Sequence, residues 1–297
     1  MLKKIFKKYA FIKLFISRLM ITFIPDTVFI KLQYRWFMKK KLNLINPEAL
    51  TEKIQWLKLY WRDPAWTICA DKYKVRDYVR DRIGEGCLIP LLGVYERVED
   101  IKLDILPDSF VLKVNHGTGQ NIICKNKANV NWKNAFKKLN DYMQFNLYLY
   151  TREWGYKNIE PKIICEEYIA DNGRSPDDYK IFCFNGEPRI IKVDSDRFNY
   201  HKINFFDLGW NVLPFGLKDY PRSKENIEKP NNLSKMIEYS RILSKDFLFV
   251  RVDFYNIKNR IYFGELTFTP GNGMHAYDPE EYDVILGSYL KLPTLKE

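Results

Sequence analysis

The stretch Arg251-Val-Asp253-Phe, followed by Tyr262-Phe-Gly-Glu265-Leu-Thr267-Phe-Thr-Pro270-Gly271, decides the fold. Its apolar residues predict two strands, 248–254 and 260–268, joined by a turn at 256–259. Glu265 and Thr267 are two residues apart, so both side chains point to one face of the sheet. If the strands pair as a hairpin, Asp253 and Glu265 converge on that face, where two carboxylates together with nucleotide phosphates would suit magnesium. The alternative is a half-exposed hairpin whose polar residues face water.

The composition is that of a chain able to fold around a sizeable core. It has 297 residues, of which 46% are hydrophobic and 16% aromatic, enough for one large domain or two smaller ones. These values exclude an intrinsically disordered chain. The formal net charge of +11 favours acidic partners, such as a nucleotide, an anionic sugar, an anionic membrane or nucleic acid, without choosing among them.

The five cysteines follow no metal-binding or disulfide pattern. None belongs to a CxxC pair, and with three histidines no spacing suggests a zinc site. Cys124, Cys165 and Cys183 lie in apolar runs and are expected to be reduced core residues, which fits a cytoplasmic protein.

Residues 1–45 form a basic, amphipathic N-terminal segment in which we expect a helix. Its apolar part, 9–32, is interrupted by charges and falls short of the roughly 20 apolar residues of a membrane span, and no small-residue cleavage site indicates a secretory signal. A helix lying on an anionic membrane surface and a helix packed on the rest of the protein both fit this segment, the second somewhat better. The residues of near-helical spacing are Phe11, Leu14, Phe15, Arg18, Leu19 and Thr22.

Periodicity predicts a mixed order of helices and strands in the rest of the chain. Helices are expected at 48–60, from Asp71 to the glycines at 84 and 86, at 131–149 and at 232–247. Further strands are expected at 88–95, 110–114, 162–169, 179–184 and 188–194. This order indicates an α+β or mixed α/β class with antiparallel strands.

Lys113 lies inside an apolar strand and is followed by the loop Asn115-His116-Gly117-Thr118-Gly119. Burying a lysine is costly unless an anion meets it, and a glycine-containing loop offers backbone N–H groups to phosphate oxygens. The loop matches neither GxxxxGK[ST] nor GxGxxG. The hypothesis of a phosphate site therefore depends on the loop and the lysine together.

Two other runs contain charges in unusual places. The strand at 162–169 ends with Glu166 and Glu167, which could present a carboxylate to a ribose beside main-chain groups that meet an adenine edge. Alone, a strand that runs out to solvent explains the same pattern. Lys72 and Lys74 lie in the first turn of the helix expected after Asp71, where the macrodipole disfavours cations unless they meet an anion or point to solvent.

These elements, in this order, resemble those of the ATP-grasp superfamily. From about Asn46 to Pro293 the chain resembles one family within it, the TupA-like family. That family is named for teichuronopeptide synthesis and is found in polysaccharide gene clusters. The similarity is carried by four runs: Leu50-Thr-Glu-Lys-Ile-Gln-Trp-Leu-Lys, Ala70-Asp-Lys-Tyr-Lys-Val-Arg, Asp178-Tyr-Lys-Ile-Phe-Cys-Phe-Asn-Gly-Glu-Pro and Tyr262-Phe-Gly-Glu-Leu-Thr-Phe-Thr-Pro-Gly. The resemblance implies an ATP-grasp fold of two α+β subdomains that grip ATP, with an N-terminal helical extension. It implies a catalytic region at 46–297 and a central subdomain with the ATP lid at about 105–170.

The resemblance also implies which residues hold ATP and magnesium. Residues 115–121 would be the flexible lid over the phosphates, and Arg251 and Lys180 would act in catalysis. Thr267 stands where many ATP-grasp enzymes have asparagine, which puts a second metal ion in doubt. The implied ATP-binding residues are Lys72 (or Lys74), Lys113, His116, Gly117, Thr118, Gly119, Glu166, Glu167, Tyr168, Ile169 and Asp178. The implied magnesium ligands are Asp253, Glu265 and Thr267.

The function implied by the resemblance is that of a Mg-ATP-dependent carboxylate–amine ligase in cell-surface polysaccharide biosynthesis. Its substrates would be an acidic sugar or polysaccharide precursor and an amine, in the cytoplasm or at the inner face of the membrane. One alternative is a glycosyltransferase, for which Asp194-Ser-Asp196 is the one candidate DxD-like motif. The other is a basic module for nucleic acid or membrane, which leaves Lys113 and the Asp253/Glu265 pair unexplained, so no nucleic acid is expected.

Overall fold

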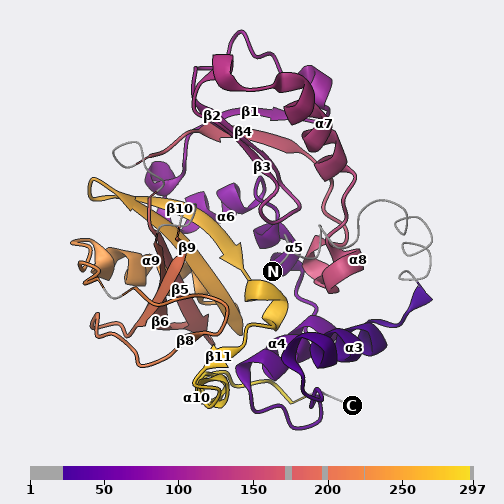
Figure 1. Cartoon of the computed structure of the whole chain (residues 1–297), viewed down its shortest axis with the longest axis vertical. Coiled ribbons are helices and arrows are strands. Elements are labelled where there is room, and N and C mark those ends of the chain that lie inside the picture. Colours follow the sequence, from indigo (N-terminus) through magenta and orange to yellow (C-terminus); the bar gives the residue numbers. More distant parts are fainter. Residues whose placement is uncertain (1–22, 171–175, 196–199, 224, 295–297) are drawn as a thin grey trace.

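The computed structural model describes residues 23–170, 176–195, 200–223 and 225–294. It has a four-stranded and a five-stranded sheet, with antiparallel pairing in both. In Figure 1 the four-stranded sheet lies at the top and the five-stranded sheet below it. The expected mixed α+β class with antiparallel strands is confirmed.

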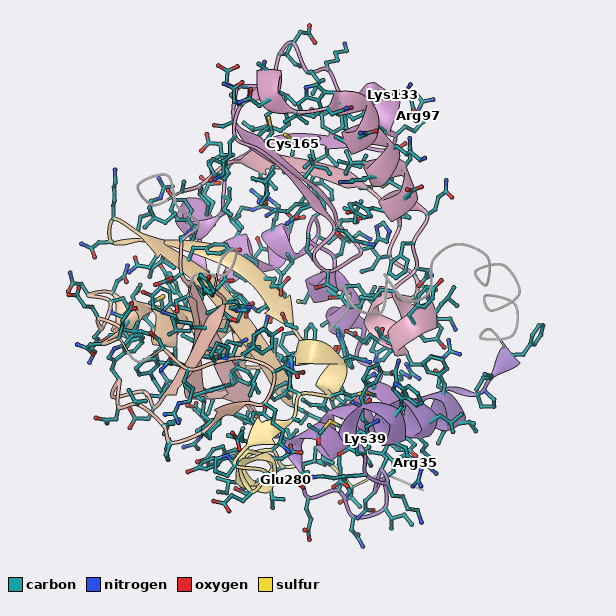
Figure 2. The ribbon with its side chains drawn as sticks, in the orientation of Figure 1. Arg35, Lys39, Arg97, Lys133, Cys165 and Glu280 are labelled. Atoms are coloured by element: carbon teal, nitrogen blue, oxygen red, sulfur yellow. The ribbon has the colours of Figure 1, made fainter. Side chains whose placement is uncertain are left out.

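The four-stranded sheet has the order β1-β4-β2-β3 and is covered by α7 (Trp132–Met143). Its inner face packs Phe110, Leu112 and Cys165 against Leu139 of that helix. Cys165 lies within this layer in Figure 2. The strands are β1 (Leu91–Tyr95), β2 (Phe110–Val114), β3 (Asn121–Cys124) and β4 (Ile163–Glu167).

The five-stranded sheet has the order β10-β9-β5-β6-β7, and α9 (Leu233–Ser244) covers one face. Because side chains alternate along β9, Val250 and Val252 pack with Met236 of α9, whereas Arg251 and Asp253 point to the opposite face. The strands are β5 (Asp178–Phe184), β6 (Glu187–Ser195), β7 (Lys202–Phe206), β9 (Phe249–Ile257) and β10 (Arg260–Thr267).

The opposite face of the five-stranded sheet is divided into an apolar half and a charged half. The apolar half packs Phe182, Phe205 and Phe249 against α4 (Leu50–Tyr60) and α10 (Tyr282–Ser288). A two-stranded sheet of β8 (Gly216–Leu217) and β11 (Tyr277–Asp278) adds to this core. The charged half is therefore left at the end of β5, β6, β9 and β10 nearer the other sheet.

Two of the expected helices have different bounds in the structure. Asp71 accepts hydrogen bonds from the backbone N–H groups of Tyr73 and Lys74, which forms a turn, so α6 (Val75–Ile83) begins later than expected and ends at Gly84. The helix expected at 131–149 is interrupted after Met143 and resumes as α8 (Tyr148–Thr151). The remaining helices are α3 (Asp26–Met38) and α5 (Pro64–Ala70), and short 3-10 turns lie at Glu85–Cys87, Val98–Asp100, Lys127–Asn129, Trp154–Tyr156 and Pro270–Gly273.

The structure tests the expectation about the cysteines but only part of the expectation about the N-terminal segment. Cys124, Cys165 and Cys183 are free and buried, as expected, and so are Cys69 and Cys87. The helical spacing noted from Phe11 to Thr22 lies outside the described residues. Within the described ranges, every helix is too short or too polar to cross a lipid bilayer. The domain boundaries at 45 and at about 105–170 stay predictions.

Candidate functional site

Arg251 lies between the two carboxylates that were predicted to converge. Pairing of β9 with β10 places Glu265 opposite Asp253, just after a bulge at Gly264. The guanidinium donates to Asp253 Oδ1 at 2.6 Å and Oδ2 at 2.5 Å, and also to Glu265 Oε1 at 3.2 Å and Thr267 Oγ1 at 3.1 Å. Thr267 in turn donates to Glu265 at 2.8 Å. One arginine therefore holds all three predicted magnesium ligands on one face.

The two carboxylates differ in acidity. Burial raises the pKa of Asp253 to about 6, although the charges of Arg251 and Lys180 oppose this effect. Burial also acts on Glu265, but the charges of Lys72 and Arg251 outweigh it and lower the pKa to about 2. Lys72 Nζ lies 3.8 Å from Glu265 Oε2. Glu265 is thus the more strongly anionic member of the pair.

A second group of charges continues across β5 and β6. Lys180 Nζ lies 2.7 Å from Asp178 Oδ2 and 2.9 Å from Asp194 Oδ2, and Lys192 Nζ lies 3.0 Å from Asp194 Oδ2. His201 Nε2 is 2.6 Å from the other oxygen of Asp194. Burial lowers the pKa of Lys192 to about 8 in spite of Asp194. The structure thus brings the predicted residues Asp178 and Lys180 into the same charged face as the carboxylate pair.

This arrangement bears on the Asp194-Ser-Asp196 motif. Asp194 is buried and already contacts three cationic or basic side chains, Lys180, Lys192 and His201. Asp196 lies outside the described residues. A metal ion at Asp194 would have to compete with these partners.

Lys72 joins the two sheets. Its ammonium donates to the carbonyl of Gly117 at 2.6 Å, and its backbone N–H donates to the carbonyl of Asn115 at 3.0 Å. Thr118 and Gly119, at the tip of the loop, are exposed, and Gly119 has a φ of 67°, which favours glycine. The predicted lid and the lysine next to it therefore lie together, close to Glu265.

The predicted phosphate site also included His116 and Lys74. The His116 ring is buried, and its pKa is lowered by burial and by the charge of Lys72, although the carbonyls of Phe145 and Tyr142 face it. Its Nδ1 lies 3.1 Å from Asn115 Oδ1. Lys74 is exposed at the start of α6, so Lys72 is the lysine of this pair that reaches the charged face.

Glu166 is paired with two cations from different elements. Lys113 Nζ lies 2.6 Å from Glu166 Oε2, and Arg76 Nη1 lies 3.0 Å from Oε1. Glu166 is buried, whereas Glu167 is exposed and its N–H donates to the carbonyl of Pro90 at 3.0 Å. The strand therefore does not simply run out to solvent, because its glutamate is held by a lysine and an arginine. Tyr168 and Ile169 follow the strand and are partly buried.

The sequence analysis missed four residues of this region: Arg76, Lys192, His201 and His275. Lys192-Val-Asp194 repeats the charge-x-charge spacing of Arg251-Val-Asp253 within an apolar strand, which is a signal that could have identified it. Burial, with the charges of Lys192 and Arg251, lowers the pKa of His275 to about 3, so its imidazole is neutral near these cations.

The donor set at β9 and β10 fits one magnesium ion together with phosphates. Within the described residues, no group of three or more His, Cys, Asp or Glu side chains forms a complete protein metal site. Magnesium usually takes one or two carboxylates and completes its shell with substrate phosphates and water. Asp253, Glu265 and the Thr267 hydroxyl are such oxygen donors, and a magnesium ion there would have to displace Arg251 from them in part.

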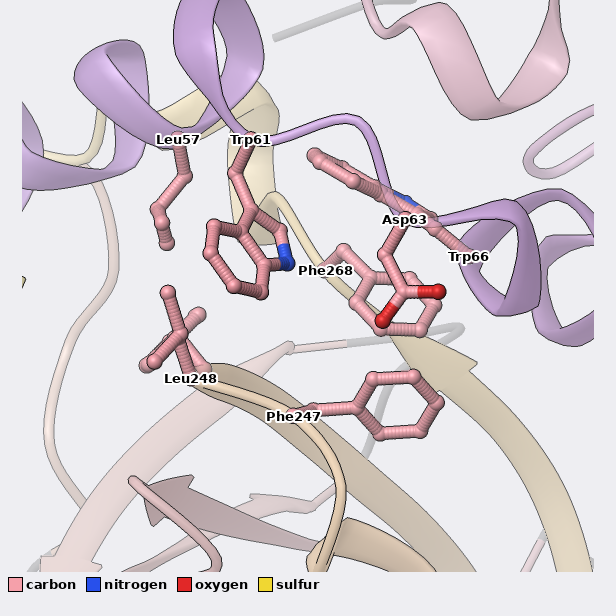
Figure 3. A pocket seen from close by; sticks show the side chains of 8 residues that line it. Leu57, Trp61, Asp63, Trp66, Phe247, Leu248 and Phe268 are labelled. Atoms are coloured by element: carbon pink, nitrogen blue, oxygen red, sulfur yellow. The ribbon is translucent and has the colours of Figure 1, made fainter. Parts of the chain in front are cut away.

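The described part of the molecule has a surface groove and a small internal cavity. A groove of about 520 Å³ is bordered by α6, the loop before β1 and the start of β10, and it includes Arg76 and Arg260. A second cavity, drawn in Figure 3, holds only about 10 Å³ between Leu57, Trp61, Trp66 and Phe268 and is nearly all apolar. The small cavity is a packing gap away from the charged face.

Comparison with known proteins gives a family and distant structural likenesses. The model of a family described as TupA-like ATPgrasp matches residues 52–291. A search of curated proteins finds no match. Among solved structures, D-alanine–D-alanine ligase from Bacillus anthracis complexed with ATP is 19% identical, with a TM-score of 0.39 over 68% of this chain and 54% of that one.

Two further solved structures have comparably low sequence identity and TM-scores. D-alanine–D-alanine ligase from Helicobacter pylori is 15% identical, with a TM-score of 0.44 over 81% of this chain and 69% of that one. L-amino acid ligase from Bacillus licheniformis is 12% identical, with a TM-score of 0.43 over 75% of this chain and 48% of that one. The aligned part spans little more than half the length of the Bacillus anthracis ligase.

Proposed function

Because the chain belongs to the TupA-like ATP-grasp family, we propose that it is a ligase that uses ATP to join a carboxylate to an amine. The observation that supports this most directly is the meeting of Lys72 and Arg251 at Glu265. Lys72 comes from the turn before α6 and Arg251 from β9, yet their charged groups lie 3.8 Å and 3.2 Å from the same carboxylate. A scaffold needs no such convergence, whereas phosphoryl transfer requires cations and carboxylates at one point.

The reaction consists of two balanced steps. The γ-phosphoryl group of ATP passes to a substrate carboxylate oxygen, which gives ADP and an acyl phosphate. The amine nitrogen then attacks the acyl carbon, loses a proton, and phosphate leaves as the amide bond forms. A magnesium ion held by Asp253 and Glu265 would neutralise phosphate charge during the transfer.

The residues of this chain supply binding and charge stabilisation. Lys72 and Lys113 would contact phosphate oxygens, with the loop 115–121 as a lid whose backbone N–H groups add further donors. Arg251 would support the transferred phosphoryl group, and Lys180 would lie beside it. Glu166 to Ile169 would hold the adenosine, with Asp178 near the ribose.

The substrates are proposed separately from the reaction. We propose an acidic sugar or polysaccharide precursor as the carboxylate and an amino acid or similar amine as the acceptor, in the synthesis of a cell-surface polysaccharide. The resemblance to a family named for teichuronopeptide synthesis motivates this choice, and the net charge of +11, which favours anionic partners, is compatible with it. A cytoplasmic site of action is part of the same proposal.

Two measurements test the ligase. Mg-ATP at about 100 times its dissociation constant should stabilise the fold by roughly 2.7 kcal/mol. A thermal shift with a UDP-sugar but none with Mg-ATP would instead favour a glycosyltransferase. In the second measurement, hydroxylamine replaces the amine in a screen of uronic acids with Mg-ATP. An acyl phosphate yields a hydroxamate, and ATP turnover without any carboxylate-dependent hydroxamate would contradict the proposed chemistry.

A further inference from the structure

Helix α3 is attached to the body of the protein by one face. Ile30, Tyr34 and Met38 are buried with Met274. The Tyr34 hydroxyl lies 2.9 Å from the Thr51 hydroxyl, so this face is joined by a polar contact as well as by packing. The helix therefore has a fixed orientation on the molecule.

The opposite face of α3 leaves large apolar side chains in solvent. Val28, Leu32 and Trp36, which we call the outer stripe, are 47%, 61% and 68% exposed. They are spaced four residues apart, so they follow one another along the outward side of the helix. Single exposed apolar residues are ordinary, but a continuous stripe ending in tryptophan indicates an interaction surface.

Basic side chains border the outer stripe. Lys31 and Arg35 are exposed and one position away from its members, and Lys39 Nζ lies 5.1 Å from the centre of the Trp36 ring. Figure 2 labels Arg35 and Lys39 beside α3. The one acidic residue of this helix, Asp26, is instead engaged by Arg152 at 3.2 Å and by Tyr148 at 2.8 Å. The outward face thus combines apolar bulk with positive charge.

We propose that the outer stripe docks α3 on the surface of an anionic lipid bilayer. Aliphatic side chains and an interfacial tryptophan flanked by lysine and arginine are the features of a helix that lies in the headgroup region. Charge disfavours the other occupants. A second copy would bring Lys31, Arg35 and Lys39 against their own equivalents, and residues 1–22 contain further basic residues and no acidic one. This surface differs from the spacing noted between Phe11 and Thr22, and the inference does not rest on the ligase activity.

The test is sedimentation of the full chain with vesicles, without ATP. The wild type should bind vesicles of phosphatidylcholine with 30% phosphatidylglycerol and should bind pure phosphatidylcholine far less. Neutralising two charges with Lys31→Gln and Arg35→Gln should lower the partition coefficient by about 30-fold, which corresponds to about 1 kcal/mol per basic residue. Leu32→Ser with Trp36→Ser should lower it at least tenfold.

Matched control variants lie at the other end of the molecule. Arg97→Gln with Lys133→Gln removes two exposed charges near α7, at the far end of Figure 2, and Ile105→Ser removes an exposed aliphatic side chain. Both controls should bind vesicles like the wild type, and all variants should keep the wild-type melting temperature because the changed residues are exposed.

Three results would overturn the proposal. The first is a wild type that does not bind the anionic vesicles. The second is unchanged vesicle binding in the Leu32→Ser, Trp36→Ser variant. If deletion of residues 1–22 then abolishes vesicle binding, those residues and not the outer stripe hold the protein on the bilayer. The third is a wild type that is dimeric by light scattering and becomes monomeric with these two substitutions, since the stripe would then be a contact between copies.

Discussion

The ammonium of Lys72, in the turn before α6, lies 3.8 Å from the carboxylate of Glu265 on β10, although the two residues are far apart in the sequence. Lys72 is anchored by its bond to the Gly117 carbonyl, and Glu265 by Thr267 and Arg251. This contact places the loop 115–121 next to the carboxylate pair. The site is therefore assembled from both sheets, and its parts can be separated by substitution.

Substitution of the two carboxylates should give equal losses of turnover but unequal losses of stability. Glu265→Gln and Asp253→Asn should each lower ATP turnover by about 100-fold or more, because metal-borne charge stabilisation is worth several kcal/mol. Asp253→Asn should also lower the free energy of unfolding by about 3 kcal/mol, since it leaves Arg251 buried without its bidentate partner. Glu265→Gln should lower it by less, about 1–2 kcal/mol, because Lys72 and Arg251 favour the ionised carboxylate in the fold while Glu265 is partly exposed and Arg251 keeps Asp253. Urea unfolding and turnover assays measure both, and normal turnover in Glu265→Gln would rule out its role at the metal.

Removal of the Lys113 charge should weaken ATP binding while the fold persists. In Lys113→Met, Glu166 keeps its contact with Arg76, so the strand stays paired. Loss of a charged hydrogen bond to phosphate should lower the affinity for Mg-ATP by about 10- to 100-fold. Isothermal titration calorimetry measures this, with Lys133→Met on the exposed side of α7 as the control. Equal affinities in the two variants would mean that Lys113 serves only to pair Glu166.

Lys58 should make the protein more stable as the pH rises from 7 towards 9. Burial lowers its pKa from 10.5 to about 7, so above pH 7 the unfolded chain binds more protons at this residue than the folded one. The free energy of unfolding then increases with pH, by about 1 kcal/mol per unit. From about pH 8 the buried thiols, whose pKa values are raised, act in the opposite direction, so the contribution of Lys58 is read from the difference between the wild type and Lys58→Met. Lys58→Met should flatten the increase measured by urea unfolding at pH 6.5, 7.5 and 8.5, and an unchanged slope would assign it to other groups.

Asn272 should stabilise the turn after β10 through its side chain. It accepts from Lys58 at 2.6 Å and donates to Gln33 at 2.9 Å, and its φ is 62°. Asn272→Gly keeps this backbone conformation but leaves buried Lys58 with one acceptor fewer, so the free energy of unfolding should fall by about 1–3 kcal/mol. Asn259→Gly is the control, because Asn259 has the same φ in an exposed hairpin turn. The free energy of unfolding of Asn259→Gly, measured in urea, should be unchanged or slightly higher. Equal losses in both variants would contradict the role of the Asn272 amide.

Local patterns predicted the parts of the site that lie within one hairpin. The alternation in Arg251-Val-Asp253 and in Glu265-Leu-Thr267 was enough to place three oxygen donors on one face, and the pairing of β9 with β10 has that geometry. The partners of Glu166 could not be found in this way. Arg76, on α6, is 90 residues away, and only the three-dimensional fold brings its guanidinium to this carboxylate. The start of α6 was also misplaced, because the Asp71 side chain forms a turn with the same hydrogen bonds that would cap a helix.

The bonds of Asn272 also connect the turn after β10 to two helices from the N-terminal part of the chain. Through Gln33 and Lys58, the turn after β10 is attached to α3 and α4, and Thr51 attaches α4 to Asp283 of α10 at 2.6 Å. Asp26 at the start of α3 is also bonded to Tyr148 and Arg152, so the same helix is attached to α8. A force on α3, such as its docking on a bilayer, would therefore be transmitted to the turn that follows the carboxylate-bearing strand β10.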